Sequence, residues 1–172
     1  MVWKHIREPK EINASHLRNL IFGVEDGLVS TVGLLSGIAI AEVPRETILI
    51  TGIVLIFVEA FSMAVGSFLS EHYAEDYLEG TETPYSLSFA DSVIMFFSYL
   101  AAGLIPLLPY IIFEKIYALT ASIMLSLVAL FSLGVYSANI SKMRVLKSGF
   151  RMLIIGGMAI AVGVVIGQLV RQ

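Results

Sequence analysis

Residues 20–41 read LIFGVEDGLVSTVGLLSGIAIA, and this stretch decides how the rest of the chain is interpreted. It is about as long as the ~20 residues that an α-helix needs to cross a bilayer. Two adjacent carboxylates, Glu25 and Asp26, interrupt it. An ionisable group inside a membrane span costs roughly 2.5–3.5 kcal/mol on insertion scales, so its presence indicates a function. The stretch therefore predicts a membrane helix that contributes to a polar pathway.

The composition predicts an integral membrane protein whose partner is the lipid bilayer. Hydrophobic residues make up 57% of the 172 positions and charged residues only 15%. The basic residues are too few and scattered for a nucleic-acid surface. With no cysteine, a bound metal ion must use oxygen, imidazole or thioether ligands. No Walker sequence is present, and we expect neither an enzyme nor a permanently bound cofactor.

Five apolar segments predict one all-α domain of five transmembrane helices. The longest polar connection, residues 71–88, is short, acidic and free of Lys and Arg. We find no internal repeat that would indicate an inverted-repeat transporter. The predicted spans are residues 20–41, 47–70, 89–113, 116–136 and 149–170.

The distribution of positive charge predicts the orientation of the chain. Five spans place the termini on opposite sides, and basic residues concentrate in cytoplasmic segments. Eight of the 11 Lys and Arg residues fall on the N-terminal side, against Arg45, Lys115 and Arg171 on the other. We therefore expect a cytoplasmic N-terminus and a C-terminus on the opposite side. The eight are Lys4, Arg7, Lys10, Arg18, Lys142, Arg144, Lys147 and Arg151.

The second span carries a polar stripe in the sequence FVEAFSMAVGSFLSEH. Glu59, Met63, Gly66 and Ser70 fall at i, i+4, i+7 and i+11, which places them on one face of an α-helix. A carboxylate in the middle of a span is expected to face the bundle interior, where it can bind a cation or carry a proton. Glu59 as a protonated, hydrogen-bonded contact between helices is the alternative, and Met63 alone would be ordinary packing.

The first span has a matching face. Asp26, Ser30 and Gly33 fall at i, i+4 and i+7, so the first two helices can present carboxylates to each other in a cation site. Glu25 points about 100° away from Asp26, so at most one of them faces a given site. The alternative for Asp26 is that it only stabilises the start of a helix, where the dipole favours acids. We expect the pathway to use Asp26, Glu59 and Met63, with Glu25 as a further candidate.

The acidic connection is a second candidate region. If the second helix continues through it, Glu71, Glu75 and Glu79 form an i, i+4, i+8 stripe flanked by His72 and Asp76. Such a stripe would collect divalent metal ions on the cytoplasmic side. The alternative is a solvated acidic helix end.

Small and helix-breaking residues predict where helices pack or bend. PLLPY in the third span breaks regular hydrogen bonding, which either kinks the helix or frees carbonyls for a cation. A GxxxG motif in the last span suits close helix contact or dimer formation. The residues assigned to packing or kinks are Gly27, Gly66, Pro106, Pro109, Gly163 and Gly167.

These segments in this order, GVEDGLVSTVGLLSG, SMAVGSFLSEH, PLLPY and a glycine-rich last helix, resemble the vacuolar iron transporter family. The resemblance implies a homodimer of five-helix subunits that moves Fe²⁺, and often Mn²⁺, out of the cytosol in exchange for protons. The family's first-helix acid corresponds to Asp26 and its pathway methionine to Met63. Ser67 stands where many members have an acid, and the cytosolic metal-binding domain of well-studied members is here much shorter.

Two other functions fit the residues without the resemblance. One is a non-transporting helical membrane subunit or scaffold, whose acids bind a partner helix. The other is a proton-coupled carrier of another cation or of a small solute. Loss of Asp26 or Glu59 would harm assembly in the first case and flux in the second.

Overall fold

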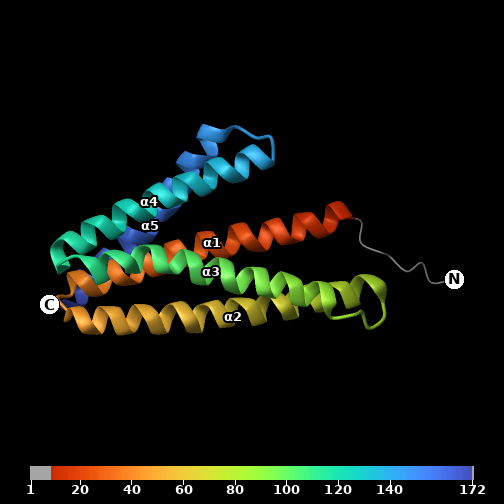
Figure 1. Cartoon of the computed structure of the whole chain (residues 1–172), viewed down its shortest axis with the longest axis horizontal. Coiled ribbons are helices and arrows are strands. Elements are labelled where there is room, and N and C mark those ends of the chain that lie inside the picture. Colours follow the sequence, from red (N-terminus) through yellow and green to blue (C-terminus); the bar gives the residue numbers. More distant parts are fainter. Residues whose placement is uncertain (1–8, 172) are drawn as a thin grey trace.

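The computed structural model describes residues 9–171 and consists of five α-helices (Figure 1). All five are long and apolar enough to cross a membrane, which confirms the predicted all-helical, five-span architecture. The helices are α1 (Pro9–Ile40), α2 (Arg45–Glu79), α3 (Ser86–Ile112), α4 (Lys115–Ile140) and α5 (Val145–Arg171).

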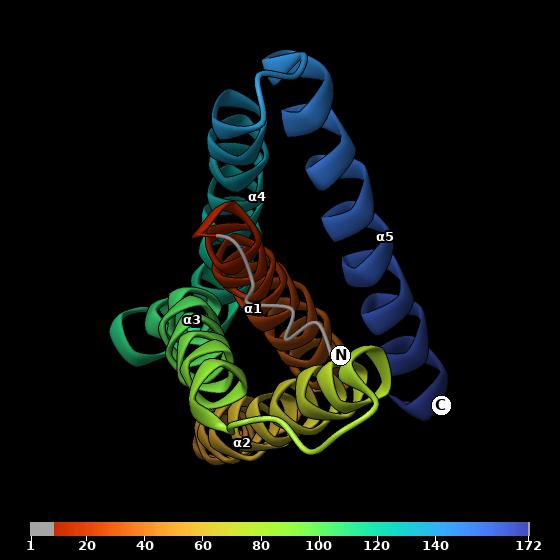
Figure 2. The ribbon, with the colours of Figure 1, turned by 90° about the vertical axis from the view of Figure 1, so that its right-hand side faces the viewer.

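Helix α1 runs through the middle of the bundle and contacts each of the other four helices (Figure 2). Helix α2 packs against α1 and α3, whereas α5 packs against α1 and α4. The main buried cluster joins α1, α2 and α3 through side chains such as Leu35, Ile56 and Leu107. Because lipid tails are as apolar as these side chains, close packing rather than water exclusion holds the helices together.

The connections alternate between the two ends of the bundle. The α2–α3 and α4–α5 connections lie at the end where α1 begins, and the α1–α2 and α3–α4 connections lie at the other end together with the end of α5 (Figure 1). This up-and-down order is the one that five consecutive spans require. It places the start of α1 and the end of α5 at opposite ends of the bundle (Figure 1).

Helix α2 continues through the segment that the sequence had suggested to be a connection. It ends at Glu79, where Gly80 adopts a left-handed conformation with φ of 64°, so the link to α3 is residues 80–85 rather than 71–88. The second span was predicted to end at residue 70 because the apolar stretch ends there. The helix extends further because its polar last turns are paired with side chains of α1 and α3, as described below.

Glycines allow α1 and α5 to touch backbone to backbone. A Cβ atom at Gly163 would collide with the Gly33 carbonyl, and one at Gly167 with the Gly37 carbonyl. The GxxxG motif of α5 therefore makes its close contact with α1 of the same chain.

Two other residues assigned to packing behave differently from each other. A Cβ atom at Gly27 would lie 2.6 Å from the Tyr99 carbonyl oxygen, so this glycine permits contact between α1 and α3. Gly66 has open space around it in the part of the chain described, because a Cβ atom added there would have no neighbour within 4 Å. Gly66 therefore makes no close helix contact within one described chain.

Helix α3 continues through both of its prolines. The carbonyl of Pro106 accepts a hydrogen bond of 2.7 Å from the Ser122 hydroxyl of α4. The Arg45 guanidinium of α2 donates to the carbonyls of Tyr110 and Ile111, at 2.8 and 2.6 Å. The two Arg45 bonds satisfy carbonyls in the last turn of α3, which a helix end leaves without intrahelical partners. The last part of α3, which contains both prolines, is therefore hydrogen-bonded to α2 and α4.

Candidate ion site between the first three helices

The structure brings Asp26 of α1 and Glu59 of α2 close together. Both side chains belong to half-buried residues, and their carboxylates are near enough to repel each other electrostatically. The juxtaposition follows from two helical faces that the spacing of polar residues already suggested. In a region of low dielectric constant this repulsion is strong, so a cation between the carboxylates would be stabilising.

Tyr99 of α3 completes a polar group contributed by three helices. It is fully buried, and its hydroxyl lies 2.6 Å from the Ser30 hydroxyl and within electrostatic range of both carboxylates. Ser30 also donates a hydrogen bond of 2.6 Å to the Asp26 carbonyl. Because a serine hydroxyl has one hydrogen, Tyr99 must be the donor to Ser30. This pair joins α3 to α1 one helical turn after Asp26.

Asp26 faces an open groove between α1 and α5. The groove has a volume of about 530 Å³, and Ser30, Gly33 and Gly37 lie along it on the same side as Asp26. Asp26 is the only charged residue among its described lining residues. The predicted Asp26, Ser30 and Gly33 face is therefore the face of α1 that borders the groove.

Two further candidates lie beside this group. Met63 is half-buried and follows Glu59 by one helical turn on the same face of α2. Glu25 is also half-buried, near the Asp26 charge, but it does not line the groove.

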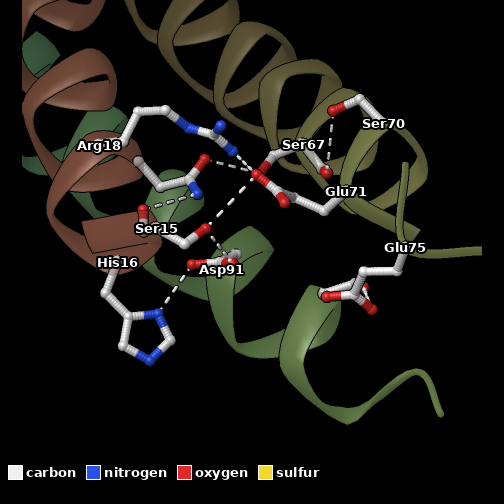
Figure 3. A network of polar contacts seen from close by, with 10 residues as sticks. Ser15, His16, Arg18, Ser67, Ser70, Glu71, Glu75 and Asp91 are labelled. Atoms are coloured by element: carbon white, nitrogen blue, oxygen red, sulfur yellow. Dashed lines mark hydrogen bonds and ion pairs between the residues drawn. The ribbon is translucent and has the colours of Figure 1, made fainter. Parts of the chain in front are cut away.

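A second polar network joins the first three helices at the end where α1 begins (Figure 3). At its centre is Asp91 of α3, which is 1% exposed. Its two carboxylate oxygens lie 2.7 Å from the Ser15 hydroxyl and 2.8 Å from His16 Nδ1. A buried carboxylate requires such partners, because its desolvation is otherwise costly. Asp91 therefore ties α1 to α3.

The acidic end of α2 belongs to the same network. Glu71 forms an ion pair with Arg18 of α1, and Glu75 accepts a hydrogen bond of 3.3 Å from Ser88 of α3. Both acids are buried, at 6% and 8% exposed. The alternative of a solvated helix end therefore does not hold for these two residues.

Of the other predicted residues at this end of α2, His72 is buried, whereas Asp76 and Glu79 are half-buried. The His72 Nε2 atom lies 3.4 Å from the Asp76 carboxylate, which also accepts hydrogen bonds from the Thr83 backbone and hydroxyl at 2.7 and 2.9 Å. Over residues 9–171, no three His, Asp or Glu side chains come together as a group able to hold a metal ion. The acidic stripe is thus not a preformed metal cluster within one described chain.

Some polar residues of these two regions were not found by sequence reasoning. Tyr99 lies in a predicted membrane span. A buried tyrosine hydroxyl needs a hydrogen-bond partner, and this need was the sequence signal that could have revealed Tyr99. His16 and Asn19 precede the first apolar stretch, so the pattern of the span did not single them out. Asn19 accepts a hydrogen bond of 2.7 Å from the Ser67 hydroxyl of α2.

Known proteins match the chain along most of its length. The model of the VIT family matches residues 17–85 and 81–168. Vacuolar iron transporter homolog 3 of Arabidopsis thaliana is 30% identical over 165 residues, which is 87% of this chain and 80% of the relative. Vacuolar iron transporter homolog 1 of Oryza sativa subsp. japonica is also 30% identical, over 87% of this chain and 71% of the relative.

A third relative matches over a shorter region. Vacuolar iron transporter 1 of Tulipa gesneriana is 37% identical over 71 residues, which is 41% of this chain and 29% of the relative. The match to the family model covers both halves of the bundle, including the helices that carry Asp26, Glu59 and Tyr99. The chain therefore belongs to the VIT family, as its first two spans had suggested.

Proposed function

We propose that the protein is a transporter, not an enzyme, that moves Fe²⁺, Mn²⁺ or both out of the cytosol in exchange for protons. The observation that carries the proposal is the pair of carboxylates, Asp26 and Glu59, which interact electrostatically within two membrane-spanning helices, with Asp26 lining an open groove. Intramembrane acids of this kind mark ion pathways. Membership of the VIT family and relatives named vacuolar iron transporters support metal as the cargo.

The ligand types suit a divalent transition metal ion. Carboxylate oxygens from Asp26 and Glu59 would balance the charge of the ion, and the Met63 thioether would favour a transition metal over Mg²⁺ or Ca²⁺. The hydroxyls of Ser30 and Tyr99 are adjacent sources of oxygen. Glu25, near Asp26, would attract the ion towards the site.

Protons would compete with the metal for the same carboxylates. A metal ion requires deprotonated ligands, so protonation of Asp26 and Glu59 from the far side would release it. Return of the protons to the cytosol would restore the charged site. Coupling through shared ligands explains exchange without a nucleotide-binding motif.

The orientation follows from the positive charge at one end of the bundle. With the start of α1 in the cytosol, the acidic end of α2 lies at the entrance. We propose that Glu71, His72, Glu75, Asp76 and Glu79 capture metal there. Because these residues form no three-ligand cluster in one described chain, capture would require ligands to leave their present partners or to come from a second copy.

A homodimer would complete the pathway. The Asp26 groove is open, and α2 beside it exposes large apolar side chains, including Phe57 and Phe61 at 54% and 66%. Two carboxylates and one thioether also leave coordination positions free around an octahedral ion. We propose that α1 and α2 of two copies face each other across this region, with the ion pathway between them.

Uptake into proteoliposomes tests the function directly. The full chain would be reconstituted with an acidic lumen, and entry of Fe²⁺, Mn²⁺, Ca²⁺ and Mg²⁺ would be followed together with lumenal pH. The proposal predicts entry of Fe²⁺ or Mn²⁺ accompanied by a rise in lumenal pH. Folded protein that moves none of the four ions would support the scaffold alternative, and coupled flux of Ca²⁺ or Mg²⁺ alone would support another cation carrier.

A further inference from the structure

A second hollow, unrelated to the candidate ion site, lies where α4 turns into α5. It has a volume of about 540 Å³ and shares no lining residue with the Asp26 groove. It is at the end of the bundle where α1 begins (Figure 1). Its lining includes four cations, Lys142, Arg144, Lys147 and Arg151, and three serines, Ser137, Ser141 and Ser148.

The four cations of this hollow have no opposing carboxylate. Residues 137–151 contain no Asp or Glu, and within residues 9–171 none of the four cations forms an ion pair. Arg18 and Arg171, by contrast, are each paired with a glutamate. A bias towards positive charge in a cytoplasmic connection requires only that the cations be present. It does not require them to converge with hydroxyl groups on one hollow.

The local fold holds these cations together. Lys142 adopts a left-handed conformation with φ of 54°, and the Met143 amide donates a hydrogen bond of 2.8 Å to the Ala138 carbonyl. The chain therefore reverses direction tightly. Gly134 lets the two helices approach, since a Cβ atom there would lie 2.7 Å from the Ser148 carbonyl oxygen.

The start of α5 gathers these cations along the hollow. Lys147 and Arg151 fall at i and i+4 on the helix, and Arg144 directly precedes it, where its carbonyl accepts a hydrogen bond of 3.1 Å from the Ser148 amide. Guanidinium groups can bind a phosphate with two parallel hydrogen bonds, and the lysines add positive charge.

Apolar side chains surround the same turn. Met143, Leu146 and Phe150 are 70%, 67% and 58% exposed. Their position at the end of two membrane-spanning helices places them where acyl chains meet headgroups. A free phosphate ion would gain nothing from this apolar surface, whereas the acyl chains of a phospholipid would pack against it.

We propose that this hollow binds the phosphate headgroup of an anionic phospholipid. The phosphate contacts Arg144, Lys147 and Arg151, and the acyl chains lie against the exposed apolar side chains of the α4–α5 turn. An anionic lipid is preferred to a zwitterionic one because the positive choline of phosphatidylcholine is repelled by the four cations.

Native mass spectrometry of the detergent-solubilised full chain tests the proposal. Retention of phosphatidylglycerol would be compared with that of phosphatidylcholine carrying the same acyl chains. We expect the wild type to prefer phosphatidylglycerol, and each neutralised cation to weaken that preference about fivefold. Arg144→Gln/Lys147→Gln and, separately, Arg151→Gln would lower it, whereas Arg144→Lys would preserve it. All three positions are exposed, so these substitutions leave the core intact.

Two controls make the test specific. Lys10→Gln removes an exposed cation at the same end of the bundle and should leave the preference unchanged. Inorganic phosphate should fail to displace the lipid. The proposal would be overturned by equal retention of the two lipids in the wild type, by an equal loss in Lys10→Gln, or by displacement with inorganic phosphate.

Discussion

The side-chain oxygens of Ser30 and Tyr99 lie 2.6 Å apart and join α1 to α3 next to the carboxylates of Asp26 and Glu59. Ser30 donates in turn to the Asp26 carbonyl, so one chain of hydrogen bonds runs from α3 to the backbone of the candidate ligand. The polar group around Asp26 thus includes a tyrosine that lies 69 residues from Ser30 in the sequence.

Tyr99→Phe should loosen this arrangement without filling or emptying the core. Loss of the hydrogen bond is expected to lower the free energy of unfolding by about 0.5–1.5 kcal/mol. Because the Tyr99 hydroxyl is also an oxygen close to both carboxylates, its loss should slow metal uptake. Thermal unfolding and proteoliposome flux measure the two effects. The exposed Tyr136→Phe is the matched control, and identical behaviour of the two variants would argue against a role for the Tyr99 hydroxyl.

The glycine contact between α1 and α5 gives a second prediction. Gly163→Ala or Gly167→Ala places a methyl group against a backbone carbonyl of α1, which cannot move as a side chain can. We expect a loss of about 1–3 kcal/mol in stability, as for other overpacked sites, seen as a lower unfolding temperature.

Gly157→Ala is the control for this prediction, since it lies on the same helix with open space around the position of its Cβ. Its stability should equal that of the wild type or exceed it. If Gly163→Ala and Gly167→Ala were as stable as Gly157→Ala, the backbone contact between α1 and α5 would be refuted.

The contacts of Asp91 lead us to expect energetic coupling between the start of α1 and the start of α3. Asp91→Asn weakens the contacts with Ser15 and His16 in a buried position, which should cost about 1–3 kcal/mol. A double-mutant cycle with His16→Ala should yield a coupling energy above about 0.5 kcal/mol, as expected for residues in direct contact. Additive effects in that cycle would show that the His16–Asp91 contact contributes nothing measurable.

Metal capture at the end of α2 can be separated from transport itself. Glu79→Gln should raise the Fe²⁺ concentration needed for half-maximal uptake while leaving the maximal rate unchanged, because the ion site between α1 and α2 is intact. Glu82→Gln removes an exposed acid from the following loop and serves as the control. Uptake curves that coincide for Glu79→Gln and the wild type would count against capture by Glu79.

The sequence predicted the parts of this molecule that depend on local pattern. Five apolar stretches gave five helices, and helical spacing placed Asp26 and Glu59 on faces that meet. The end of α2 at Glu79 was not predicted, because it depends on contacts of Glu71 and Glu75 with distant helices. Apolarity alone could not reveal those contacts.

Local sequence pattern also could not predict contacts between residues that are far apart in the sequence. Tyr99 and Ser30 are 69 residues apart, and His16 and Asp91 are 75 apart. The GxxxG motif of α5 indicated close packing, but only the fold identifies its partner as α1 of the same chain.

Fe²⁺ uptake by Asp26→Asn and Glu59→Gln, measured in proteoliposomes with an acidic lumen, tests the central claim most directly. Hydrogen bonds and contacts to charged groups are worth about 1.5–3 kcal/mol, so each variant should take up Fe²⁺ at least about tenfold more slowly and lose the coupled rise in lumenal pH. Glu46→Gln removes an exposed acid at the start of α2 and should behave as the wild type. Folded Asp26→Asn and Glu59→Gln variants that transport Fe²⁺ at the wild-type rate would contradict a shared carboxylate site.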